Sequence, residues 1–182
     1  MFVEIRQPDS DYIIIPRVSS ENRQFIPIGF LDKTIIASDS TAFIPNATLY
    51  EFGIITSTMH MAWMRYVCGR LEMRYRYSNT IVYNNFPFPN STEKQKESII
   101  REAQSVLYAR KKYPELSLAE LYETNSMLPE LVKAHQKLDK AVEAAYGKNF
   151  TSDAERVAHL FSLYQSMTAG LFVGKSKPGN KQ

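Results

Sequence analysis

Charged and apolar side chains alternate along Leu71–Tyr77. If this segment is a β-strand, Glu72, Arg74 and Arg76 share one face at intervals of about 6–7 Å. Such a row suits base edges in the major groove of DNA, because arginine forms paired hydrogen bonds with guanine and a carboxylate accepts from cytosine. The alternative is a solvated strand face on which Glu72 pairs with one of the arginines. The opposite face would pack on the protein: Leu71, Met73, Tyr75 and Tyr77.

The charge around this segment is locally basic. The whole chain has a formal net charge of +3, and residues 1–89 carry eight basic and eight acidic side chains. Within that neutral half, residues 65–76 hold four arginines against the single acid Glu72. A basic stripe on a neutral background is typical of a protein that recognises specific DNA rather than any polyanion. Arg70 is therefore a further candidate for DNA contact.

A second polar cluster occupies residues 16–23. Arginine and serine side chains between strands can bind phosphates and set the register of a protein on the duplex. We predict this role for Arg17, Ser19 and Arg23. The alternative is an ordinary polar loop.

Signatures of catalysis are missing from the sequence. It has no glycine-rich phosphate or dinucleotide loop. His60, His135 and His159 lack metal-ligand spacing, and the single cysteine, Cys68, excludes a cysteine-based zinc site. A nucleophile–histidine–acid set assembled in space stays open, although no local motif supports one. We predict no catalytic residue and no metal site.

The segment Asn84–Phe88 superficially suggests methyltransferase chemistry. Adenine amino-methyltransferases hold the target amine with an Asn/Asp-Pro-Pro-Tyr/Phe loop, but here Phe86 replaces the first proline. We interpret the segment as an aromatic-proline linker that packs over the junction between two parts of the chain.

The pattern of elements changes at this linker. Before it, β-branched runs predict strands, and a Met- and aromatic-rich stretch predicts one helix over 48–68. After it, helical periodicity, capping residues and prolines predict helices. The expected strands are 11–16, 24–30, 33–37, 71–77 and 80–83, and the expected later helices are 91–112, 116–122, 129–146 and 151–169. The fold class is thus α+β, a mixed α/β part (1–89) followed by an all-α bundle (90–173).

Composition bounds the class further. A hydrophobic content of 44% predicts a folded core, and residues 174–182 predict a flexible tail because they have no apolar anchor. One cysteine indicates a reducing compartment, and the sequence shows neither a secretion leader nor an apolar run that could span a membrane. We expect a cytoplasmic protein without membrane contact.

Four specific segments follow one another along nearly the whole chain: Pro16–Phe30; Phe52–Met64; Gly69–Ser78 with Ile81–Pro89; and Leu131–Asp139 with Glu155–Phe161. Taken together, they resemble the C-terminal end of the MmeI-like (type IIL) family of single-chain restriction-modification enzymes. Phe88 stands where a tryptophan is expected, which is a conservative departure.

The resemblance implies that residues 1–89 are the later portion of a target-recognition domain and residues 90–173 a helical C-terminal domain. The parent enzyme would be an adenine-N6 DNA methyltransferase with endonuclease activity, using S-adenosylmethionine and Mg²⁺. Its base-specifying side chains would correspond to Glu72, Arg74 and Arg76 and to a loop near Ser40. Partners would be double-stranded DNA and the methyltransferase domain of the same full-length chain. The bases recognised do not carry over, and this chain would lack both catalytic regions, beginning within a longer protein.

Two other functions remain open. The amphipathic helices around Leu131, Leu138 and Leu160 could form a protein-interaction or scaffolding module without direct DNA contact. An enzyme with an unrecognised site is the third possibility.

Overall fold

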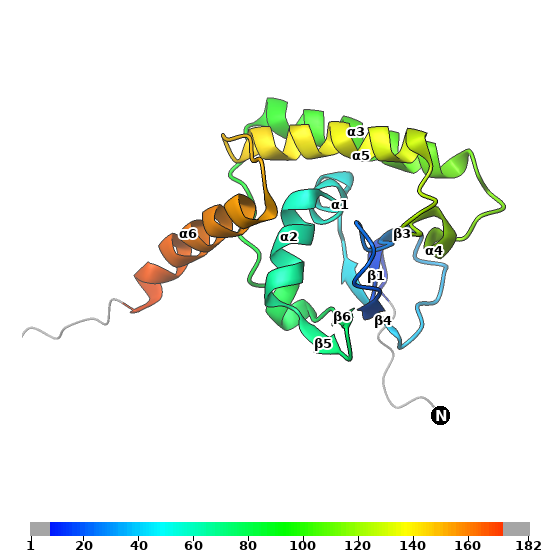
Figure 1. Cartoon of the computed structure of the whole chain (residues 1–182), viewed down its shortest axis with the longest axis horizontal. Helices are drawn as coiled ribbons and strands as arrows, with labels where there is room; N and C mark the ends of the chain where they lie inside the picture. Colours follow the sequence, from blue (N-terminus) through cyan, green and yellow to red (C-terminus); the bar gives the residue numbers. More distant parts are fainter. Residues whose placement is uncertain (1–7, 173–182) are drawn as a thin grey trace, which may run out of the picture.

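Two small antiparallel sheets, six α-helices and one π-helix make up residues 8–172, the part that the computed structural model describes (Figure 1). The sheets lie in the first half and the longest helices in the second. The predicted α+β class is confirmed. The predicted tail, 174–182, lies outside the described residues.

The first sheet has β1 (Tyr12–Pro16) at its centre, between β3 (Gly29–Leu31) and β4 (Thr41–Pro45). The strand expected at 11–16 is thus confirmed, whereas that at 24–30 forms only at its end. Ile28 N donates to Ile26 O at 2.8 Å, and this tight turn bends the chain at the intervening proline. The strand expected at 33–37 is wrong, because Asp32 accepts from the Thr34 amide and starts a turn. β4 was not predicted.

The helix expected over 48–68 is two helices, α1 (Leu49–Ile55) and α2 (Thr58–Val67). The break falls at Thr56 and Ser57, whose hydroxyls donate back to helix carbonyls. A carboxylate from the second half of the chain, Asp139, then accepts from the amide and hydroxyl of the first residue of α2 at 2.7 and 2.6 Å. Tertiary contact therefore starts α2 afresh.

The second sheet has the order β2-β6-β5, with β2 at Val18–Ser19, β5 at Gly69–Leu71 and β6 at Arg74–Arg76. The strand expected at 80–83 is wrong, because Asn79–Tyr83 forms the π-helix η1. The Trp63 indole of α2 donates to the Val82 carbonyl at 3.0 Å and holds η1 on the core.

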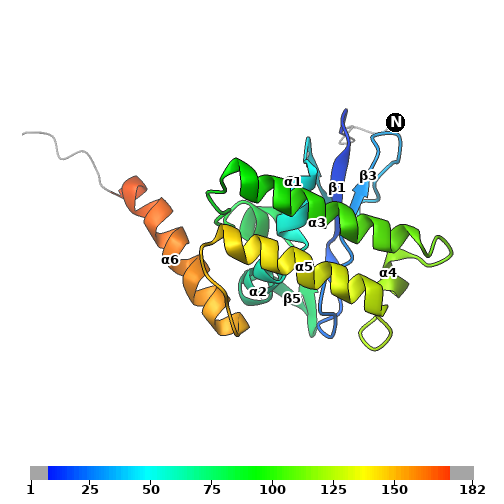
Figure 2. The ribbon, with the colours of Figure 1, turned by 90° about the horizontal axis from the view of Figure 1, so that it is seen from above.

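The four helices predicted after residue 90 are all present: α3 (Glu93–Lys111), α4 (Leu118–Leu121), α5 (Pro129–Ala145) and α6 (Asp153–Phe172). Their ends follow local rules. Thr92 and Gln95 form a reciprocal capping box on α3, and Gly147 has a φ of 71° just after α5. Figure 2 shows α6 extending away from the pair formed by α3 and α5.

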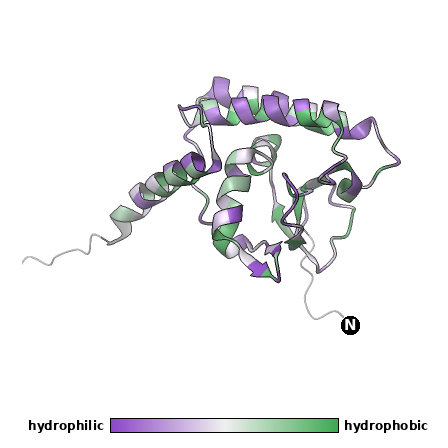
Figure 3. Cartoon of the chain, viewed as in Figure 1, coloured by the Kyte–Doolittle hydropathy of each residue, from purple (hydrophilic) through white to green (hydrophobic). Residues whose placement is uncertain are grey.

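The two halves share one apolar core. α3 and α5 lie side by side over α1 (Figure 1), and their hydrophilic residues face outward (Figure 3). A Cβ added to Gly53 of α1 would lie 2.7 Å from Ile99 Cγ2 and 3.2 Å from Ala103 Cβ. Only glycine lets α1 approach α3 this closely. Within residues 8–172, no helix is long and apolar enough to cross a membrane.

Candidate nucleic-acid interface

The segment expected to be one strand at 71–77 is a hairpin. Leu71 pairs with Arg74, so β5 and β6 are joined by the two-residue turn Glu72–Met73. Glu72 has a φ of 59°, in the left-handed region that glycine adopts most easily. The prediction of a continuous strand was therefore wrong. The turn could not be recognised from the sequence, because glutamate is not a residue type typical of this turn position.

Antiparallel partners lie on the same face of a sheet, so the register defines two faces. The outer face carries Leu71, Arg74 and Arg76, all exposed. Tyr75 and Tyr77 are buried, as predicted for the packing face. The prediction failed for the other two members of that face, because Leu71 joins the arginines and Met73 lies exposed in the turn. The shared face of Arg74 and Arg76 is confirmed. Glu72 lies in the turn, at the end of this face.

Glu72 and Arg74 form an ion pair of 2.9 Å, with side-chain exposures of 76% and 47%. This is the pairing that the solvated-face alternative anticipated. An exposed pair contributes only about 0–1 kcal/mol. The pair can therefore open at little cost when the arginine meets another acceptor.

Three segments far apart in the sequence meet beside the hairpin. Tyr77 N donates to Arg17 O at 2.8 Å, and Arg17 N donates to Ser40 O at 3.1 Å. The Arg17 guanidinium Nε donates to the carbonyls of Asp39 and Thr41 at 3.2 and 3.1 Å. The structure thus brings Arg17 and the loop containing Ser40 to the hairpin, and backbone hydrogen bonds hold the three segments together.

Arg70 has protein partners. Its guanidinium donates to Arg65 O and Met73 O, both at 3.3 Å, and lies 4.2 Å from the centroid of the Tyr75 ring. These contacts tie the hairpin turn to the end of α2. Arg70 pairs across the strands with Tyr75, so it belongs to the face of the hairpin that does not carry Arg74.

The other two predicted phosphate-binding residues lie away from the exposed face. Ser19 is 3% exposed, and its hydroxyl faces the core. Arg23 donates to the carbonyl of Ala119 and to the Glu123 carboxylate at 3.3 and 3.2 Å, so it fastens the first half to α4. The roles of Ser19 and Arg23 in DNA contact stay predictions. Neither residue places a free polar group on the exposed face of the hairpin.

A buried polar contact supports the hairpin from behind. His60 Nε2 of α2 lies 2.9 Å from the hydroxyl of Tyr77. Burial lowers the pKa of His60 to about 3 and raises that of Tyr77, so both groups are neutral. Phe86 packs edge-on against His60 at 4.7 Å. The Asn84–Phe88 segment is accordingly a packed linker.

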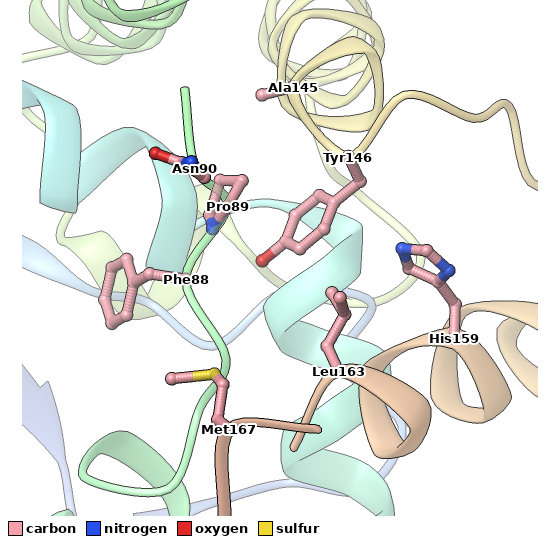
Figure 4. A pocket seen from close by; sticks show the side chains of 8 residues that line it. All are labelled: Phe88, Pro89, Asn90, Ala145, Tyr146, His159, Leu163 and Met167. Carbon is pink, nitrogen blue, oxygen red and sulfur yellow. The ribbon is translucent and has the colours of Figure 1, made fainter. Parts of the chain in front are cut away.

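The linker also borders a cavity of about 400 Å³ between α5 and α6 (Figure 4). Tyr146 projects into it and donates to Pro87 O at 2.9 Å, and His159 and Met167 line the α6 side. Among residues 8–172 no three histidine, cysteine or carboxylate side chains gather in a way that could hold a metal ion.

The fold and the site together define a two-part module, a small α+β part with an arginine-bearing hairpin followed by a helical part. Residues 1–90 match the family described as "MmeI, target recognition domain", and residues 91–172 match "MmeI, C-terminal domain". The chain therefore belongs to the MmeI family, and the resemblance inferred from the sequence is confirmed. Both matches are to recognition and C-terminal domains, and neither is to a catalytic domain.

Two relatives agree with this assignment. DNA methyltransferase A of Bacillus subtilis (strain 168) is 44% identical over 157 residues, covering 86% of this chain and 18% of its own length. A solved structure of the type IIL restriction-modification enzyme MmeI in complex with DNA superposes with a TM-score of 0.87 at 54% identity, covering 91% of this chain and 22% of that one. The chain thus spans about a fifth of the length of either relative.

Sequence reasoning missed the exposure of the apolar residues Leu71 and Met73 at the hairpin. The missing signal was the turn, since neither glycine nor asparagine marks it. Once Glu72 is known to adopt a positive φ, the exposure of both apolar residues follows from the register.

Proposed function

We propose that this chain is the DNA-sequence recognition part of a longer adenine-N6 DNA methyltransferase that also restricts DNA. The observation that carries the proposal is the two-stranded hairpin with Arg74 and Arg76 exposed on one face, fastened beside Arg17 and the Ser40 loop. A two-stranded ribbon fits the major groove, where each base pair presents a distinct pattern of donors and acceptors.

The contacts of each residue suggest its role in recognition. Arg74 and Arg76 face outward and donate to base edges, and Glu72 accepts from a base or releases Arg74 to do so. Ser40 approaches the DNA from the adjacent loop, which Arg17 holds in place. Arg70 positions the turn. Left-handed backbone at a residue other than glycine costs roughly 1 kcal/mol or more, and such strain is concentrated at functional sites.

Catalysis belongs to the remainder of the longer protein. Its methyltransferase domain would bind S-adenosylmethionine, its nuclease would use Mg²⁺, and both would act on the sequence that the hairpin selects. The longer protein would act in the cytoplasm. We expect the 182-residue chain to transfer no methyl group from labelled S-adenosylmethionine to DNA, and measurable transfer would assign it a catalytic site of its own.

The proposal is tested by mapping methylated sites in cells that express the full-length enzyme. Arg74→Ala or Arg76→Ala should relax or change one position of the methylated motif, at a cost of about 1–3 kcal/mol for the original base. Arg101→Ala, an exposed arginine on α3, is the matched control and should leave the motif intact. An unchanged motif in both hairpin variants, with normal activity, would remove the hairpin from base recognition.

A protein-interaction module is the second candidate. An open apolar hollow of about 510 Å³ lies between α2 and α6, lined in part by Tyr66 and Phe161. Tyr66 is 69% exposed, so an aromatic surface is available there. A stable dimer of the chain in solution, without effect on DNA, would favour this function over recognition.

A further inference from the structure

The tip of the hairpin is apolar as well as basic. Met73 is 70% exposed in the turn, and Leu71 is 43% exposed on the same outer face as Arg74. Both belong to the segment that the proposed function places against DNA. The hydrogen bonds that shape the turn use the backbone of Met73, since Arg70 donates to its carbonyl. Its side chain is not needed to form the turn.

Neighbouring exposed apolar side chains can mark a binding surface, and covering them with another apolar group is favourable. A base edge in the major groove offers one strong apolar partner, the C5-methyl group of thymine. Methionine suits such a contact because its unbranched thioether chain adapts to irregular surfaces. Leu71 and Arg74 are cross-strand partners on one face, with Cβ atoms about 4.5–5.5 Å apart, and Met73 precedes Arg74 in the turn. The apolar and the charged side chains are therefore close enough to meet neighbouring base pairs, which lie about 3.4 Å apart along the duplex.

We propose that Met73, with Leu71 beside it, packs on the C5-methyl group of a thymine in the recognised sequence, next to the base pair that Arg74 contacts. The hairpin then recognises an A·T pair by apolar contact and its neighbour by hydrogen bonds. This inference rests on the proposed function and adds a specificity-determining residue to it.

The experiment uses the full-length enzyme and duplexes that contain the methylated motif found by mapping. Each thymine in turn is replaced by deoxyuridine, which lacks only the C5-methyl group, and equilibrium binding is measured. For the unaltered enzyme, one replacement should weaken binding about threefold to fourfold, the effect of removing one buried methyl group. For Met73→Ser the same replacement should have a much smaller effect, because the main partner of the methyl group is already gone.

Two variants serve as controls. Met73→Leu keeps an apolar side chain and should retain most of the sensitivity to deoxyuridine. Met167→Ser, which alters a methionine that is 63% exposed on α6, should behave like the unaltered enzyme. Binding that is insensitive to deoxyuridine at every position, or equally sensitive in Met73→Ser, overturns the inference. The proposed function fails separately, if Arg74→Ala and Arg76→Ala leave the motif unchanged.

Discussion

Arg110 and Arg74 are the same residue type in two regions, the junction between the halves and the outer face of the hairpin. Arg110 is 7% exposed, and its guanidinium donates to the Tyr122 hydroxyl at 2.9 and 2.5 Å and to the Ile28 carbonyl at 2.8 Å. The same hydroxyl lies 2.6 Å from His135 Nε2. Arg74 has one exposed carboxylate partner.

The difference shows what makes an arginine available for recognition. The donors of Arg110 meet fixed neutral acceptors in the core, so breaking those bonds would leave buried polar groups unpaired. Arg74 exchanges one solvated partner for another at little cost. The junction therefore uses arginine to hold the halves together, and the hairpin uses it for contacts outside the chain.

The largest expected effect is on stability at the junction. Arg110→Met should lower the free energy of unfolding by about 3 kcal/mol, because the Ile28 carbonyl and the Tyr122 hydroxyl lose their donor. Arg74→Met should change it by about 0.5 kcal/mol or less. Urea unfolding of both variants measures the contrast. Equal losses would show that the two arginines do not differ in structural role.

Acid should act on the buried histidines behind the hairpin and at the junction. The pKa of His60 is about 3 in the folded chain, and burial, followed by the nearby Arg110 charge, also lowers that of His135. The unfolded chain thus takes up protons first, and stability is lost as the pH falls below about 6.5. Burial raises the pKa of Asp139 to about 6, so its protonation between pH 6 and 4 partly offsets this loss.

For His60 we expect a loss of about 2 kcal/mol between pH 6.5 and 5 before that offset. His60→Gln, which keeps a neutral acceptor for Tyr77, should reduce the slope of unfolding free energy against pH by about one proton. Unfolding in urea at several pH values measures the slope. An identical slope in the variant would mean that His60 is not the titrating group.

The smallest effect is expected at the turn. Glu72→Gly should raise stability by up to about 1 kcal/mol, because glycine adopts a positive φ without strain. The same change should alter the methylated motif of the full-length enzyme, since the carboxylate is lost. Unfolding and motif mapping are compared on one variant. A gain in stability with an unchanged motif would leave the strain at Glu72 without a function.

The predicted helices after residue 90 agree with the structure because their signals are local. Thr92 caps α3 and Pro129 opens α5 through contacts within a few residues. The helix predicted over 48–68 failed because its break depends on Asp139, more than 80 residues later. The hairpin failed for another reason, since glutamate is a rare residue at a left-handed turn position.

The sequence by itself determined the α+β class, the family, the helical second half and the shared face of Arg74 and Arg76. These follow from hydrophobic periodicity, helix capping and family-specific segments. All three can be read from residues that are close together in the sequence. Only the tertiary structure decided that Arg70 and Arg23 have protein acceptors, that Arg17 and the Ser40 loop meet the hairpin, and that Met73 is exposed. Each depends on which distant segments pack together, and local residue preference carries no information about that.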